Sequence, residues 1–235
     1  MNSIIEGFLK AFSLIVDFDP ELIGIILLSL EVSGIALVIA SSLGIPAGSF
    51  LGLKKFRGRG FIISLSNTFM GLPPVVVGLF VYLLLSRRGP IGFMALLYTP
   101  SAMITAQTIL VFPIVTSLCH SAVISVDPII RQAAVTLGAT PFQAALTVIK
   151  EARYGILSGV IAGLGRAMGE VGAILIVGGN IAGYTRVMTT TIALETDKGN
   201  FELALALGII LLIISLLINI GLHLIQRKGM VITIR

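Results

Sequence analysis

The chain has 235 residues, of which 56% are apolar and 11% charged, and it carries a net charge of +5. Soluble domains have about 25% charged residues, so this chain has too few charged side chains to cover a globular core. The composition excludes an ordinary soluble enzyme, a disordered chain and a secreted disulfide scaffold. It predicts an all-α integral membrane protein with a single domain over residues 1–235.

The positive charge does not indicate nucleic-acid binding. The 16 Lys and Arg residues occur in short clusters between apolar runs, and the chain has no Trp. Charged loops at a membrane surface explain the balance better. Cys119 and His120 are adjacent, but no second Cys completes a metal-ligand set, so we expect them to pack and predict no metal site.

Five apolar stretches are long enough to cross a bilayer, since each is near the ~20 residues that a spanning helix needs. The segment Ser3–Val16 is shorter and carries Glu6 and Lys10, so we interpret it as an interfacial helix. Together they predict a helical bundle with its core at about residues 20–226. The five stretches are Leu22–Ile45, Phe61–Leu85, Ser101–Val126, Tyr154–Val177 and Leu203–Ile225.

The loop charges predict the orientation of the chain. Ten Lys and Arg residues fall on one side of the predicted spans and five on the other, with Arg166 inside a span. Cytoplasmic loops carry an excess of basic residues. We therefore expect a multi-pass protein of the inner (cytoplasmic) membrane, with its N-terminus outside and its C-terminus in the cytoplasm.

Glycine and proline interrupt the predicted spans. Gly71-Leu72-Pro73-Pro74 breaks the second, Pro113 lies within the third, and Gly44-Ile45-Pro46 is expected to close the first. In lipid, the backbone groups freed by a break need other partners, so breaks occur where helices pack or line a cavity. We expect Pro73 and Pro74 to belong to a pathway or gate, although such residues are common in membrane helices generally.

The connection 127–150 predicts two short helices with a sharp turn. Asp127 is placed to cap the first helix, with Pro128 at its first position, and Gly138 supplies the left-handed residue that ends it. Thr140 and Pro141 begin the second helix in the same way. This is the longest connection on the basic side of the predicted membrane.

Each of these two helices has one apolar face. Helices that lie on a membrane surface are rich in Lys and Arg, but only Arg131 is basic between Asp127 and Lys150. The small pair Ala133 and Ala134 permits close approach of another surface. Docking into a groove of a partner protein therefore fits the pattern better than a lipid anchor.

The run Gln132-Ala133-Ala134, three residues and then Gly138 resembles the Glu-Ala-Ala loop of ABC importer permeases. In that family the loop forms a coupling helix that sits in a groove of the cytoplasmic ATPase. The resemblance implies that ATPase subunits dock here, through residues that include Asp127, Arg131, Gln132, Thr140 and Pro141. Gln132 replaces the usual Glu, so it keeps hydrogen bonding but lacks the charge.

Three more segments resemble the molybdate, tungstate and sulfate branch of these permeases: Leu72–Gly78, Arg166–Ala173 and Gly178–Glu195, the last most similar to tungstate-type permeases. The resemblance covers about residues 22–225 and implies the type I importer fold. It implies a permease subunit for tungstate or molybdate, paired with a second copy. ATP and Mg would bind a separate ATPase, with no cofactor on this chain. An extracytoplasmic oxyanion-binding protein would dock near Arg87–Pro90 and Gly178–Asn200.

Arg166 and Glu170 are four residues apart within the fourth predicted span, so they are expected to share a helix face and pair. Charged residues inside a membrane usually face a bundle interior or water. Glu31, midway along the first span, could reach Arg166 from a neighbouring helix. These residues either hold helices together or contact a substrate anion in the pathway.

An oxyanion also needs hydrogen-bond donors along its route. Thr189, Thr190, Thr191 and Asn180 could supply them without tight binding, and we expect Thr189 and Thr190 to belong to the pathway. High affinity would lie with the external binding protein.

Two other classes of function remain open. A secondary carrier or channel for a small anion could use Arg166, Glu170 and Glu31 as coupling groups, although we see no inverted repeat. A non-transporting membrane scaffold or sensor is the other. The chain has no P-loop, zinc-protease motif or nucleophile elbow, so we expect no catalysis by this polypeptide.

Overall fold

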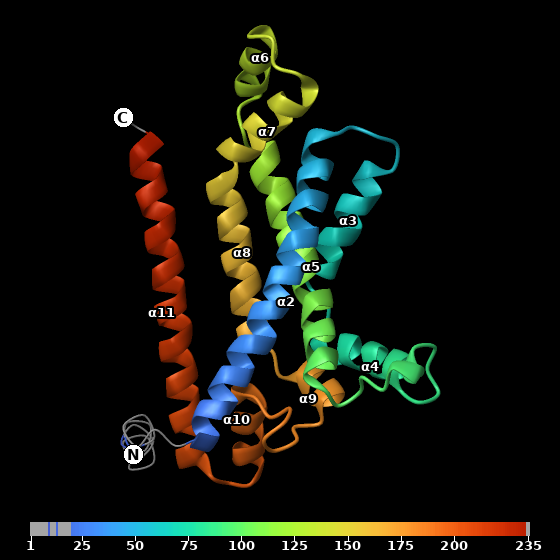
Figure 1. Cartoon of the computed structure of the whole chain (residues 1–235), viewed down its shortest axis with the longest axis vertical. Coiled ribbons are helices and arrows are strands. Elements are labelled where there is room, and N and C mark those ends of the chain that lie inside the picture. The colour runs from blue at the N-terminus through green and yellow to red at the C-terminus, as the bar shows by residue number, and fades with distance from the viewer. Residues whose placement is uncertain (1–8, 10–12, 14–19, 234–235) are drawn as a thin grey trace.

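The computed structural model describes residues 9, 13 and 20–233, and within them the chain is built from helices (Figure 1). Three helices are long and apolar enough to cross a membrane: α2 (Pro20–Leu53), α5 (Pro100–Ile124) and α11 (Phe201–Thr233), the last over Phe201–Leu222. Two bent pairs of helices are also long and apolar enough to cross a membrane if each pair is taken as one span. They are α3 (Arg59–Phe69) with α4 (Pro74–Leu85), and α8 (Arg153–Met168) with α9 (Gly172–Gly178).

Four short helices complete the described fold: η1 (Gly92–Met94), α6 (Pro128–Thr136), α7 (Pro141–Glu151) and α10 (Met188–Asp197). The five predicted spans correspond to the three long helices and the two bent pairs. The predicted interfacial helix Ser3–Val16 lies outside the described residues except for Leu9 and Ser13.

The prediction that Gly44-Ile45-Pro46 closes the first span was wrong. α2 continues through Pro46 to Leu53. A proline inside a membrane helix is tolerated where neighbouring elements pack against it and satisfy freed backbone groups. The bond that Pro46 cannot make is the one to the Ser42 carbonyl. α5 packs against the helix at this place, with the Cys119 Sγ 3.4 Å from the Ile45 carbonyl oxygen and 3.5 Å from the Ser49 Oγ.

Close packing of α2 on α5 depends on glycines spaced four apart. A Cβ added to Gly44 would lie 3.1 Å from Val115 Cγ1, and one on Gly48 would overlap the Thr116 carbonyl oxygen. A Cβ on Gly52 would lie 2.6 Å from Val123 Cγ1. Small residues at this spacing let two membrane helices approach closely, so this face of α2 has no room for larger side chains.

α8 also packs against α5 through glycines spaced four apart, on another side of α5. A Cβ on Gly155 would lie 2.7 Å from the Ala122 Cβ, and one on Gly159 would lie 2.9 Å from the Leu118 Cβ. A Cβ on Gly163 would lie 3.0 Å from Val111 Cγ1. α5 is thus the central helix, held between a glycine face of α2 and a glycine face of α8.

The two ends of the molecule differ in content (Figure 1). α6 and α7 lie at one end with the α2–α3 connection and the C-terminal end of α11, and α4, α9 and α10 lie at the other. The exposed basic residues Lys54, Lys55 and Arg57 therefore lie at the same end as Arg131 and Lys150. This geometry agrees with the grouping of loops by charge.

Candidate functional site

The predicted break at Gly71-Leu72-Pro73-Pro74 is present, and it is severe. α3 and α4 meet at 102°. α3 ends at Phe69, and α4 begins with Pro74 at its first position, where a missing N–H leaves no hydrogen bond unmade. The freed Leu72 N–H donates to the Phe69 carbonyl oxygen at 3.2 Å, while the Leu72 carbonyl faces a neighbouring helix.

A second break separates α8 from α9, where the sequence predicted one continuous span. The two helices meet at 57°, and α8 ends at Met168. The prediction that Glu170 shares a helix face with Arg166 was therefore wrong, because Glu170 lies in the break. Gly169 and Gly172, which flank this position, are the signal that could have indicated a break, since glycine is a weak helix former.

The carbonyl of Ala167, at the end of α8, accepts from the Glu170 N–H at 3.3 Å and is also contacted from two other helices. Gln107 of α5 donates from Nε2 to this oxygen at 2.9 Å, and the Ser33 Oγ of α2 lies 3.5 Å from it. Gln107 is almost fully buried. It was missed in the sequence, although an uncharged amide within the apolar run Ser101–Val126 is the signal that could have found it.

Glu170 binds the other side of the same break. Its Oε1 accepts from the Ala173 N–H at 3.0 Å, its Oε2 lies 3.7 Å from the Arg166 Nη2, and its backbone carbonyl accepts from the Thr189 hydroxyl at 2.8 Å. The predicted pairing of Arg166 with Glu170 is thus confirmed. The carboxylate is 3% exposed, and a buried carboxylate requires such partners.

Arg166 also contacts the first break. Its Nη2 donates to the Leu72 carbonyl oxygen at 3.3 Å. Close packing joins the two bends as well, because a Cβ on Gly78 would lie 2.8 Å from the Ala173 Cα, and one on Gly172 would lie 3.0 Å from Val75 Cγ2. Both predicted gate elements, the proline break and Arg166, therefore meet at one junction.

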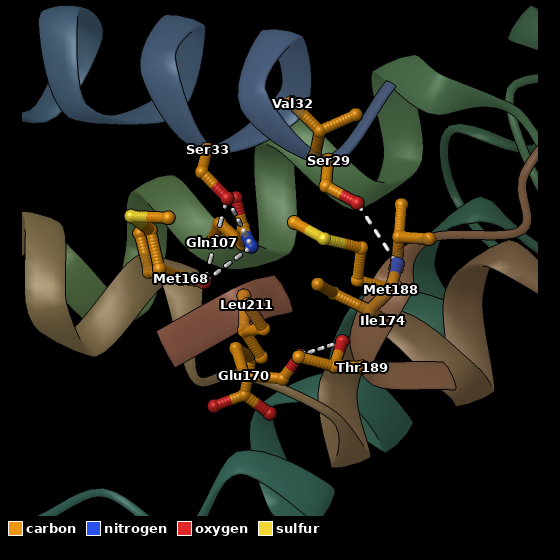
Figure 2. Close-up of a pocket in the computed structure, with 12 residues that line it drawn as sticks. Ser29, Val32, Ser33, Gln107, Met168, Glu170, Ile174, Met188, Thr189 and Leu211 are labelled. Atoms are coloured by element: carbon orange, nitrogen blue, oxygen red, sulfur yellow. Dashed lines mark hydrogen bonds between the residues drawn. The ribbon is translucent and has the colours of Figure 1, made fainter. Parts of the chain in front are cut away.

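The interior beside this junction is narrow. A cavity lined by residues of α2, α5 and α8–α11 has a volume of about 10 Å³, enough for one water molecule. Figure 2 shows Gln107, Ser33 and Met168 on one side of it and Ile174, Met188 and Thr189 on the other. A tetrahedral oxyanion does not fit here. The Arg166 side chain is 34% exposed, so it reaches the surface of the chain.

Four residues considered for the pathway are engaged or placed differently than expected. Glu31 is exposed, and within the described residues it takes part in no ion pair, so it does not reach Arg166. The hydroxyl of Thr189 donates to Glu170, and those of Thr190 and Thr191 donate to the Val187 carbonyl. All three threonines are buried. Their donors hold α10 in place and are not free for an anion.

The segment Gly178–Asn200 is not a plain connecting loop. It contains α10, whose first N–H, that of Met188, donates to the Ser29 Oγ of α2 at 2.9 Å. Thr185 is fully buried and donates to the Gly178 carbonyl oxygen. Much of this segment is thus core, which leaves less of it available for a partner than the sequence suggested.

The predicted two-helix connection is present in detail. The Asp127 carboxylate accepts from the Ile129 N–H at 2.9 Å, and Gly138, at φ 85°, follows the end of α6. Thr140 and Gln143 form a reciprocal capping box at the start of α7. Each local signal acts as predicted, because the turn chemistry depends on neighbours in sequence alone.

This connection lies at one end of the molecule (Figure 1), and several of its apolar side chains are exposed. Leu137 is 88% exposed, Phe142 77% and Ile129 65%. A groove of about 580 Å³ runs between α6 and α7, with Ala133, Ala134, Gly138 and Gln143 in its lining. Arg131 and Gln132 are exposed beside it. Contiguous exposed apolar surface of this kind marks an interaction site.

Cys119 and His120 make packing contacts. His120 Nε2 lies 3.4 Å from the Arg59 Nη2, and Arg59 Nε donates to the Leu51 carbonyl oxygen at 2.6 Å. Both residues are buried in α5. Their contacts fix the start of α3 against α2 and α5.

Curated relatives cover nearly the whole chain. A tungstate uptake system permease protein of Peptoclostridium acidaminophilum is 44% identical, over 97% of this chain and 100% of that protein. A probable anion ABC transporter permease of Haloferax volcanii is 47% identical, over 84% and 88%. The molybdenum transport system permease protein of Escherichia coli K12 is 31% identical, over 89% and 96%.

The fold matches that of a solved importer. A crystal structure of a bacterial alginate ABC transporter in complex with an alginate-bound periplasmic protein superposes with a TM-score of 0.73 at 20% identity, over 94% of this chain and 86% of that one. A family model described as the inner membrane component of binding-protein-dependent transport systems matches residues 44–229. The chain therefore belongs to that family, the membrane-spanning permeases of ABC importers.

Proposed function

We propose that this permease imports tungstate or molybdate in an ATP-driven transporter. The observation that carries the substrate class is the 44% identity, over 97% of this chain, to a tungstate uptake permease. The more distant similarity to a molybdenum permease supports the same group of tetrahedral dianions. The interior cavity is too narrow for an anion, so the chain must change shape at the two joined bends before an anion passes.

The α6–α7 connection is the proposed docking element for a separate ATPase subunit. Leu137 and Phe142 expose large apolar side chains at an aqueous end of the chain, which costs free energy unless a partner covers them. The groove beside Ala133 and Ala134 gives a partner close access to the backbone. ATP and Mg would bind that partner, and ATP hydrolysis would occur there and not on this chain.

Two copies of the chain would form the pathway between them. The cavity inside one chain holds at most a water molecule, whereas Arg166 at the junction is 34% exposed on the surface. A route for an oxyanion along this junction therefore needs a second wall, which a second copy would supply. ATP binding would turn this pathway outward, and hydrolysis would turn it inward.

In the proposed orientation, α6 and α7 lie in the cytoplasm and the N-terminus lies outside. The basic residues at the α6–α7 end support this by the positive-inside rule. The connections at the opposite end would then receive an extracytoplasmic oxyanion-binding protein, which would supply most of the affinity. The engaged threonine hydroxyls support a pathway that holds its anion weakly.

Reconstitution tests this function. The permease is placed in proteoliposomes with its ATPase. Uptake of tungstate is measured with ATP on the side of the ATPase and the binding protein on the opposite side. We expect uptake that requires all three components and ATP hydrolysis. Competition by molybdate and sulfate then ranks the substrates.

The matched control is the permease alone under a proton or sodium gradient. Uptake in that control would assign the chain to secondary carriers and contradict the proposal. If the complete system hydrolyses ATP but moves no oxyanion, the substrate class is wrong while the ABC mechanism stands.

A further inference from the structure

The connection between α4 and α5, residues 86–99, forms a depression at the end of the molecule opposite to α6 and α7 (Figure 1). Its volume is about 690 Å³, and its polar lining consists of Tyr82, Ser86, Arg87, Arg88 and Tyr98. The charged side chains in this lining are both arginines. The wall of the depression is therefore positively charged, at the end where the proposed function places the incoming anion.

The backbone around the depression has a fixed shape. The connection folds back on α4, with the Ile91 N–H donating to the Leu84 carbonyl oxygen at 3.2 Å. A Cβ on Gly89 would overlap the Leu83 carbonyl oxygen, and one on Gly92 would overlap that of Ser86. Only glycine fits at these two positions, so the arginines are carried by a closely packed turn.

Backbone strain is concentrated in the same wall. Ala95, at φ 51°, and Tyr98, at φ 62°, adopt left-handed conformations that residues with a Cβ rarely take up. Such strain persists where surrounding contacts fix it, and it often accompanies binding sites. Here the Tyr98 N–H donates to the Val177 carbonyl oxygen of α9 at 2.9 Å, and its ring lies against Gly179.

The two arginines of the wall keep their hydrogen-bond donors free. Within the described residues, Arg87 and Arg88 form no ion pair and no side-chain hydrogen bond. The ring centroids of Tyr82 and Tyr98 are 6.3 Å apart, and a hydrogen bond between the two phenols raises the pKa of Tyr98. Ser86 already donates to Leu83.

Two guanidinium groups and a phenol present donors without a competing acceptor charge. Guanidinium groups bind the oxygen atoms of oxyanions in pairs, and such charge-assisted bonds are the strongest in proteins. A tetrahedral dianion offers four acceptor oxygens, which a spherical halide does not. We propose that this depression binds a tetrahedral oxyanion directly, as a receiving site that lies before the junction of the two bends. The inference rests on the proposed import of oxyanions.

The test measures binding without the external binding protein. Purified permease with its ATPase is titrated by equilibrium dialysis with radiolabelled molybdate, in low salt and without nucleotide. We expect saturable binding that molybdate and sulfate compete for, chloride competes for poorly, and added salt weakens. The double variant R87Q/R88Q is expected to lower the affinity by at least about tenfold.

Three controls make the result specific. K54Q/K55Q removes the same charge at the other end of the chain and should bind like the wild type. R87K/R88K keeps the charge without the paired donors and should bind with intermediate affinity. Y82F should weaken binding by a few fold, and each variant must retain its ATPase on purification.

Absence of saturable binding in the wild type, or unchanged binding in R87Q/R88Q, would overturn the inference. If R87Q/R88Q lowers only receptor-dependent uptake, the arginines contact the binding protein instead, and the inference is also overturned. In both cases wild-type uptake would continue, and the proposed function would stand. Loss of oxyanion transport by the wild type itself would reject the proposed function.

Discussion

Arg166 donates from Nη2 to the backbone carbonyl of Leu72, 3.3 Å away and 94 residues earlier in the chain. The same nitrogen lies 3.7 Å from the Glu170 carboxylate. One guanidinium thus contacts both helix breaks, and a change at either bend must alter the hydrogen bonds of the other. The contact makes Arg166 a connecting element of the fold, whether or not it also contacts an anion.

Arg166→Gln should be more harmful than the double change Arg166→Gln with Glu170→Gln. The single variant leaves a buried carboxylate with one partner fewer, at a cost of about 1–3 kcal/mol. The double variant removes that charge and keeps an acceptor for the Ala173 N–H. The apparent Tm of the purified permease and oxyanion uptake both measure this, with Arg153→Gln as an exposed control. Additive losses would contradict the pairing.

Gly48→Ala should destabilise the permease by about 1–3 kcal/mol, because the added methyl group overlaps the Thr116 carbonyl oxygen of α5 and lies 2.8 Å from the Cys119 Cβ. Gly34 provides a matched control on the same helix, since a Cβ there meets nothing within 4 Å. Gly34→Ala should leave stability unchanged or raise it by about 0.5–1 kcal/mol. Thermal unfolding in detergent distinguishes them, and equal Tm values would show that α2 and α5 are not closely packed.

Ala133→Leu should block docking of the ATPase while leaving membrane insertion intact. Ala133 lines the groove between α6 and α7, and a larger side chain would fill it. We expect at least about a tenfold loss of co-purified ATPase, equivalent to about 1.4 kcal/mol.

Gly138→Val should act on the same docking through the backbone, because Gly138 is at φ 85° and a β-branched residue there costs about 1–2 kcal/mol. Thr136→Leu is the control for both variants, since Thr136 is exposed but lies outside the groove lining. Normal ATPase recovery with both Ala133→Leu and Gly138→Val would remove this surface from the docking site.

Glu195 should make stability depend on pH on the acid side. Its pKa is held below the ordinary value of 4.5, first by a hydrogen bond from Lys198 at 2.7 Å and then by Asn200 and the charge of Arg186. Because the folded state favours the ionised form, this stabilisation is complete above pH 4.5 and is lost as the pH falls through the folded pKa.

Glu195→Gln should therefore flatten the decline of Tm below pH 4.5. Glu202→Gln, which changes an exposed carboxylate at the start of α11, should leave the decline unchanged. Parallel pH profiles for wild type and Glu195→Gln would show that the Lys198 contact does not contribute.

The sequence predicted features set by neighbours along the chain. The caps at Asp127 and Thr140, the turn at Gly138 and the proline break before α4 all depend on local chemistry. It did not predict the bend after Met168, because no proline precedes it and the partners that stabilise it, such as Gln107, come from a distant helix. Nor could the sequence tell that Glu31 faces outward, since the apolar residues of α2 are spread around the helix and mark no single buried face.

The threonines show the same limit. Thr189 and Thr190 resemble donors for an anion when only their chemistry is considered, but their hydroxyls are used within the chain. Pro46 resembled a helix end for the same reason. Helix α2 continues past Pro46 where it packs closely against α5, and the sequence alone does not show this contact.

The glycine contacts on both sides of α5 have a mechanical consequence. Glycines let the backbones of α2 and α8 pack directly against α5. The three helices can slide or separate only by losing many contacts together, so we expect them to move as one rigid unit. A displacement of α6 and α7 would then move this rigid unit as a whole. The displacement reaches the two kinks that Arg166 links, where the chain is already bent and yields most easily.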